Sequence, residues 1–105
     1  MNDKKVKVTS DAKKDLGRYL DYIRRVLKNP QAARSVAEDF RETKSKLAGI
    51  ADSLKKPDSA ALVQRGLKRY NFLHHDYLLL FRVKGEIVEI TNIFHASEDY
   101  ENKLR

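Results

Sequence analysis

The spacing of apolar residues switches near the middle of this chain, from three- and four-residue steps between residues 16 and 54 to near-alternation between residues 66 and 94. A helix buries one stripe of side chains, whereas a strand turns successive side chains to opposite faces. A chain of 105 residues holds one modest hydrophobic core. The sequence therefore predicts one α+β domain over residues 1–105, with helices in the first half and strands in the second.

Two amphipathic helices are predicted in the first half. Ser10 and Asp11 are favourable helix-start residues, and Asn29-Pro30 ends the first helix and begins the second. The first apolar stripe consists of Leu16, Tyr19, Leu20, Ile23, Val26 and Leu27, and the second of Ala33, Ala37, Phe40, Leu47, Ile50, Ala51 and Leu54. Because so few residues separate the two helices, they are predicted to form an antiparallel hairpin.

Four strands complete the predicted order β-α-α-β-β-β. Val6 and Val8 alternate with lysines and predict a short first strand, while residues 66–72, 77–83 and 86–94 predict a meander of three. Residues 74–76 and 84–85 form the turns, and Gly85 accepts a positive φ without cost. The sheet is thus small and mainly antiparallel, with the first strand added at one side. Residues 60–61 begin a further short turn, and residues 95–105 form a short helix or an ordered tail.

Both faces of the predicted sheet are apolar. Tyr77, Leu79, Phe81 and Val83 alternate with Leu78 and Leu80 on the third strand, and Ile87 and Ile93 oppose Val88, Ile90 and Phe94 on the last. A helical hairpin covers one face of a small sheet, so the other needs the chain's own tail, a second copy or a partner. We favour a partner because the tail is short; the alternative is that the tail suffices.

The net positive charge of the chain comes entirely from its first half. Residues 1–57 carry 15 basic and 8 acidic side chains, whereas residues 58–105 carry 7 of each, which gives a net charge of +7. Such a surplus attracts nucleic acid or an acidic protein segment, although a solvated helix face explains it equally well. The absence of Cys excludes disulfides and thiolate metal sites. With neither a signal-peptide pattern nor a membrane-spanning run, we expect a cytoplasmic protein.

The sequence contains no strong catalytic or cofactor motif. A P-loop, a glycine-rich dinucleotide turn and a His-Glu-x-x-His zinc motif are all missing, so we expect neither a cofactor nor a metal. The pair His74-His75 is interpreted as part of a turn. Arg65, Lys68 and Arg69 form a basic cluster suited to phosphate or carboxylate groups, or an ordinary solvated edge. His95 is either a proton carrier or a hydrogen-bonded histidine at a strand end.

An ordered set of short motifs resembles the RelE/ParE superfamily of bacterial toxins. The motifs are Arg65-Gly66-Leu67-Lys68-Arg69, residues 77–83, Val88-Glu89-Ile90, Ile93-Phe94-His95, and Asp99-Tyr100 with Leu104; Ala12, Asp15-Leu16, Tyr22-Ile23 and Ala32-Ala33 are similar to the family's first helical hairpin. The likeness spans nearly the whole chain. It implies a growth-inhibiting toxin whose cognate antitoxin wraps across the helices and the sheet. The candidate antitoxin-binding residues are Leu78, Leu80, Ile87 and Ile93.

The resemblance implies one of two activities. RelE-like toxins cleave messenger RNA on the ribosome, which would assign phosphate binding to Arg65, Lys68, Arg69 and Arg82 and proton transfer to His95 or Tyr100. ParE-like toxins block DNA gyrase and need no catalytic set. Leu78 stands where RelE-like toxins commonly carry Arg, and Ala96-Ser97 stands where a second cation follows the last strand. Because losing one such group costs about 100-fold in rate, we expect ParE-like inhibition of gyrase. The alternatives are a metal-independent, ribosome-dependent endoribonuclease and a non-toxic member that only binds a partner.

Overall fold

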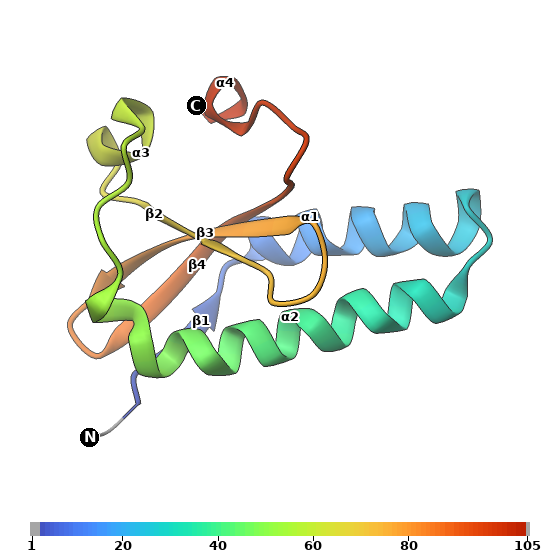
Figure 1. Cartoon of the computed structure of the whole chain (residues 1–105), viewed down its shortest axis with the longest axis horizontal. Helices are drawn as coiled ribbons and strands as arrows, with labels where there is room; N and C mark the ends of the chain where they lie inside the picture. The colour runs from blue at the N-terminus through green and yellow to red at the C-terminus, as the bar shows by residue number, and fades with distance from the viewer. Residues whose placement is uncertain (1–2, 105) are drawn as a thin grey trace.

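The computed structural model describes residues 3–104 and confirms the predicted order of helices and strands (Figure 1). The main elements are β1 Lys5–Val8, α1 Ser10–Asp21, α2 Pro30–Ile50, β2 Lys68–Asn71, β3 Tyr77–Lys84 and β4 Ile87–His95. Two short helices, α3 Ala60–Gln64 and α4 Tyr100–Lys103, occupy the segments where a further turn and a tail were expected. The strands form one mixed sheet in the order β1-β4-β3-β2, with β1 parallel to β4 and the other pairs antiparallel.

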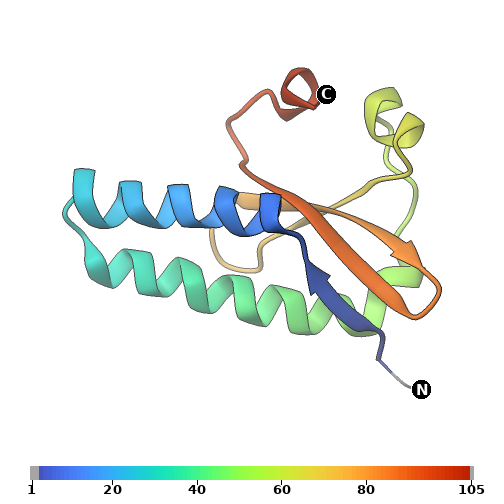
Figure 2. The ribbon, with the colours of Figure 1, turned by 180° about the vertical axis from the view of Figure 1, so that it is seen from behind.

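The helical hairpin packs on one face of this sheet (Figures 1 and 2). The α1 helix is capped by the hydroxyl of Thr9, which accepts a hydrogen bond from the Ala12 N–H at 3.2 Å, one residue before the predicted start. The α2 helix begins as predicted, because the Asn29 side chain accepts from the Ala32 N–H at 3.0 Å and Pro30 occupies the first turn. No helix within residues 3–104 has both the length and the apolar character needed to cross a membrane.

The turn of the hairpin places Lys28 in the left-handed region, with φ at 54°. This residue follows a π-helical turn, Tyr22–Val26, and the Asn29 N–H bonds back to the Ile23 carbonyl at 3.1 Å. A side chain in that conformation is strained by about 1 kcal/mol, and glycine is not. We expect Lys28→Gly to raise the free energy of unfolding by about 0.5–1 kcal/mol, measured by urea denaturation.

A matched control lies on α2, where Lys46 is exposed in a regular helix interior. There the same substitution, Lys46→Gly, should lower the free energy of unfolding by about 1 kcal/mol because glycine is a poor helix former. Effects of the same sign at both positions would show that the backbone of Lys28 is not strained.

The second face of the sheet is covered by the chain itself, so the prediction that a partner covers it was wrong; the alternative, cover by the chain's own tail, holds in part. Leu78 and Leu80 are both 0% exposed. They pack with Leu62 of α3, Leu67 and Phe94, and with the partly buried Tyr100 and Leu104 of the tail. Figure 1 shows α3 and α4 on the side of the sheet opposite the hairpin. The α3 region and the tail, which are distant in sequence, together cover this face. Leu78 and Leu80 were predicted to contact the antitoxin because they would be exposed, and they are buried instead.

A β-bulge corrects the predicted orientation of the last strand. Between β3 and β4, Phe81 pairs with Ile90 but its neighbour Leu80 pairs with Asn92, so Thr91 is an extra residue on β4. An extra residue reverses the in–out alternation beyond it. Ile93 therefore joins Val88 and Ile90 in the helix-side core, and Phe94 alone turns to the other face. Ile93, predicted to contact an antitoxin, is fully buried, whereas Ile87 remains 42% exposed.

Beyond the end of β1, side chains from α1 satisfy the outer edge of β4. The parallel pairing with β1 ends at Ile90. Past it, Asp15 accepts a hydrogen bond from the Ile93 N–H at 3.0 Å, and the Tyr19 hydroxyl accepts from the His95 N–H at 3.2 Å. These bonds fix the outer side of α1 against the carboxyl end of β4.

Candidate protein-binding groove

The six residues predicted for RNA cleavage do not form one site. In the β2–β3 register Lys68 lies opposite Phe81, on the helix side, whereas Arg69 lies opposite Leu80, on the other face. The ring of His95 packs edge-on against Tyr77, with 5.0 Å between ring centroids. Within residues 3–104, the only direct side-chain contact between two of these six residues joins Arg69 to Tyr100.

Each of these side chains is bound to a neighbour. Arg65 donates to the Ala61 carbonyl at 3.3 Å, Lys68 to the Leu54 carbonyl at 2.8 Å, Arg82 to the Glu89 carboxylate at 2.8 Å, and His95 Nδ1 lies 2.7 Å from the Ser97 hydroxyl. The hydrogen bond from Arg82 lowers the pKa of Glu89, so this ion pair persists in mild acid. Arg65 and Arg82 border one shallow depression together with Lys103. The arrangement resembles structural pairing more than a phosphate-binding centre.

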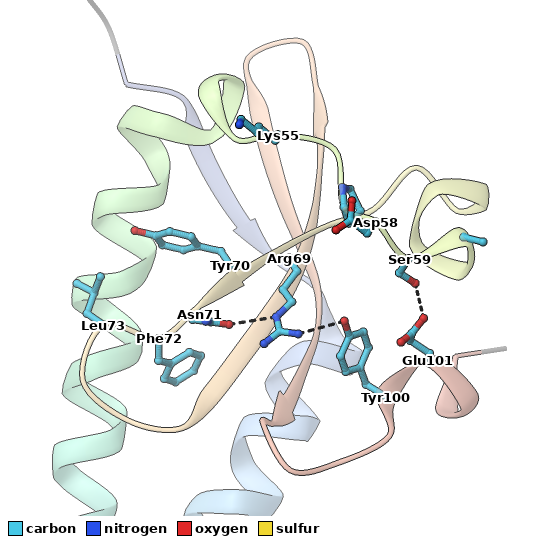
Figure 3. Close-up of a pocket in the computed structure, with 12 residues that line it drawn as sticks. Lys55, Asp58, Ser59, Arg69, Tyr70, Asn71, Phe72, Leu73, Tyr100 and Glu101 are labelled. Atoms are coloured by element: carbon cyan, nitrogen blue, oxygen red, sulfur yellow. Dashed lines mark hydrogen bonds between the residues drawn. The ribbon is translucent and has the colours of Figure 1, made fainter.

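A polar groove runs beside the edge strand β2 (Figure 3). The Arg69 guanidinium lies over the Tyr100 ring and donates to its hydroxyl at 3.3 Å, while the Ser59 hydroxyl donates to Glu101 at 2.5 Å. These contacts tie the loop before α3 and the tail to β2. The charges that line this groove are mixed, with Lys55 and Arg69 beside Asp58 and Glu101, so the groove favours no single charged ligand.

A more apolar groove, here called the α1 groove, lies between the outer side of α1 and the end of β4. Its volume is about 730 Å³. Tyr19 and Tyr77 meet edge to face within it, with ring centroids 5.1 Å apart. The lining residues are Asp15, Arg18, Tyr19, Tyr22, Ile23, Leu27, Tyr77, Asn92, Phe94, His95, Glu98 and Lys103. An aromatic floor between two segments is typical of a site that accepts apolar side chains of a partner.

The tip of the helical hairpin extends the α1 groove with an exposed apolar patch. Tyr22 is 53% exposed, Val26 62% and Leu27 56%, although the sequence pattern placed Val26 and Leu27 on the inner stripe. The hairpin is longer than the sheet that it covers, so its tip projects beyond the strands (Figures 1 and 2). Val26 and Leu27 lie in the helical region as predicted, but at the hairpin tip they have no sheet to pack against.

The acidic and basic side chains that line the α1 groove form two ion pairs, Glu98 with Lys103 and Asp15 with Arg18. Glu98 accepts hydrogen bonds from Tyr19, from Lys103 at 2.5 Å and from the His95 N–H at 2.9 Å. Burial alone would raise the pKa of Glu98, but these hydrogen bonds lower it to about 2. Burial and the neighbouring Glu98 raise the pKa of the Tyr19 hydroxyl. Arg18, on the rim, pairs with Asp15 at 2.6 Å and is largely exposed.

The lowered pKa of Glu98 predicts acid sensitivity. A carboxyl whose folded pKa lies below its unfolded value of 4.5 stabilises the fold above that pH and loses the contribution as the pH falls toward about 2. Between pH 7 and pH 3 we expect wild type to lose about 1–2 kcal/mol more stability than Glu98→Gln. Thermal melts of both proteins at the two pH values measure this difference. Equal losses would mean that Glu98 carries no such contribution. The subtraction cancels Asp15, whose pKa burial raises and which therefore acts in the opposite direction.

Comparison with known proteins agrees with the fold. A family model described as "ParE toxin of type II toxin-antitoxin system, parDE" matches residues 6–100. Seven chains of solved structures match, among them one titled "Chromosomal ParDE TA system from P. aeruginosa", with 24% sequence identity and a TM-score of 0.75 over 90% of this chain and 97% of that chain. No curated protein sequence matches significantly.

Proposed function

Because the chain belongs to the ParE family of type II toxins, we propose that it inhibits DNA gyrase and that a cognate antitoxin neutralises it by occupying the α1 groove. The observation that carries the proposal is an exposed apolar hairpin tip that continues an aromatic groove, on a helical segment, residues 10–28, with a surplus of basic side chains. Both features suit a protein partner. We further propose that this activity takes place in the cytoplasm, where gyrase acts.

The scattering of the predicted catalytic residues supports gyrase over RNA as the target. Phosphoryl transfer without a metal needs several cations and a proton carrier converging on one phosphate. Here His95 and Lys68 lie apart from Arg69 and Tyr100, and Arg82 is held by Glu89. An inhibitor that acts by binding needs a complementary surface and no convergent catalytic set.

The chemistry of the antitoxin segment follows from the α1 groove. Large apolar side chains would enter beside Tyr22 and Leu27, where few polar groups must be desolvated. Residues 10–28 carry six basic and three acidic side chains, and two of those acids pair with Arg18 and Arg24. An amphipathic helix with acidic residues beside its apolar stripe fits both properties.

The decisive experiment runs two assays on the same purified protein. We expect the chain to inhibit supercoiling by gyrase, and the product of an adjacent antitoxin gene to restore it. In a translation reaction, messenger RNA should stay intact. Cuts within translated codons that disappear in Arg65→Ala or His95→Ala would replace gyrase with the ribosome and its messenger RNA as the target.

A further inference from the structure

Three polar side chains outside the grooves form a hydrogen-bonded chain between α2 and the turn that joins β2 to β3. Ser35 Oγ lies 3.2 Å from His75 Nε2, and His75 Nδ1 lies 2.7 Å from Asp39 Oδ2. Ser35 and Asp39 are four residues apart on α2 and so share one face of the helix. The order of hydroxyl, imidazole and carboxylate is the one that activates a serine nucleophile.

Asp39 determines which nitrogen of His75 carries the hydrogen. The carboxylate is buried, and it also accepts hydrogen bonds from Thr43 Oγ1 and from the Leu73 and His74 N–H groups. Burial alone would raise the pKa of Asp39, but the hydrogen bonds from His75, His74 and Thr43 lower it. An ionised carboxylate only accepts, so His75 Nδ1 carries the hydrogen, and Nε2 of a neutral imidazole is then an acceptor. In this tautomer the Ser35 hydroxyl donates to Nε2.

Ser35 is accessible, and its hydrogen bond is unusual for a helical serine. Serine inside a helix commonly donates to the carbonyl four residues earlier. The contact of Ser35 is instead made with an imidazole from another element. Ser35 is exposed, and the side chain of His75 retains 30% exposure. A small electrophile can approach Oγ from solvent while the imidazole stays in contact.

We propose that Ser35 is a nucleophilic modification site that accepts an acyl group from activated esters, whether aryl esters or thioesters. Ser35 Oγ bonds to the acyl carbon while its proton passes to His75 Nε2. The bond from the acyl carbon to the leaving oxygen or sulfur breaks, and the leaving group departs with the electron pair. Asp39 stabilises the imidazolium, which then releases its proton to water.

The open position of Ser35 predicts acylation without turnover. Water rather than a preorganised pair of donors stabilises the developing oxyanion, so hydrolysis of the acyl-serine receives little help. The expected product is a stable acyl-serine on the exposed face of α2. This inference does not depend on gyrase inhibition, because none of the three residues lines the α1 groove.

The test uses the folded, full-length protein with p-nitrophenyl acetate as the probe. Acetylation is followed by mass spectrometry of peptides cut after glutamate, which keeps Ser35 away from a peptide end. Two exposed serines serve as internal controls. Ser53 donates to the Ile50 carbonyl at 2.7 Å, and Ser97 contacts His95 in a pair that no carboxylate joins among the described residues. General-base assistance is worth about 100-fold or more. Because the Ser35–His75 pair is open to solvent, we expect a smaller gain, with acetylation of Ser35 at least about tenfold faster than that of Ser53. The rate at Ser97 should lie between these two.

A variant locates the general base. His75→Gln should slow acetylation of Ser35 by about tenfold or more and leave Ser53 unchanged, with circular dichroism to verify the fold. If His75→Gln does not fold, the comparison of Ser35 with Ser53 in wild type still decides. Equal rates at these two serines, or an unchanged rate in folded His75→Gln, would overturn the proposal and leave the three residues as a structural clamp.

Discussion

Replacing Asp39 with alanine is expected to lower the free energy of unfolding by about 3 kcal/mol. Asp39 lies buried on α2 and accepts four hydrogen bonds, of which the three from Leu73, His74 and His75 hold the β2–β3 turn against the helix. The variant leaves the His74 N–H and the His75 ring without their acceptor, and an unsatisfied buried donor costs about 1–3 kcal/mol. Urea denaturation, monitored by far-UV circular dichroism, gives the value.

The matched control for this variant is the neighbouring Glu38, which is exposed on the same helix. Glu38→Ala removes a carboxylate of similar charge without breaking a described hydrogen bond, so its effect should stay within about 0.5 kcal/mol. If Asp39→Ala destabilised no more than Glu38→Ala, the turn would be held by the apolar contacts of Phe72 and not by the carboxylate.

Replacing Tyr22 with aspartate is expected to weaken antitoxin binding by about 30-fold, which corresponds to about 2 kcal/mol. The ring of Tyr22 is 53% exposed and lines the α1 groove, so an aromatic contact with the partner is available there. The new carboxylate also repels an acidic partner segment. Because the side chain is largely in solvent, the isolated toxin should fold normally. Isothermal titration calorimetry with the purified antitoxin measures the change in Kd.

Val63 provides the control for Tyr22, because it is also an exposed apolar residue, 49% exposed, and lies outside the α1 groove. Val63→Asp should leave the antitoxin Kd within about twofold of wild type. Ile87→Asp tests the one sequence-based antitoxin residue that is still exposed. A large loss with Ile87→Asp and none with Tyr22→Asp would move the antitoxin from the α1 groove to the β3–β4 hairpin.

For some parts of the candidate site, the sequence indicated the type of residue but not its exposure or its contacts. Leu27 was recognised as an apolar helix position, Tyr22 only as part of the pair Tyr22-Ile23 that resembles the family's first hairpin, and His74-His75 as a turn pair, which the structure confirms. The sequence did not reveal that Tyr22 would be exposed or that His75 would contact Ser35 and Asp39. Glu98 belongs to none of the motifs that the sequence singled out. Its three hydrogen bonds come from partners up to 79 residues away in sequence.

The sequence by itself determined the local order of the chain. The change of apolar period, the Asn29-Pro30 boundary and the turn at Gly85 depend on short-range sterics and hydrogen bonds, and the structure confirms them. Only the tertiary structure decided that α3 and the tail cover Leu78 and Leu80, that the bulge at Thr91 turns Ile93 inward, and that the hairpin tip projects beyond the sheet. These outcomes depend on the lengths and register of segments far apart in the chain, which a periodic pattern does not encode.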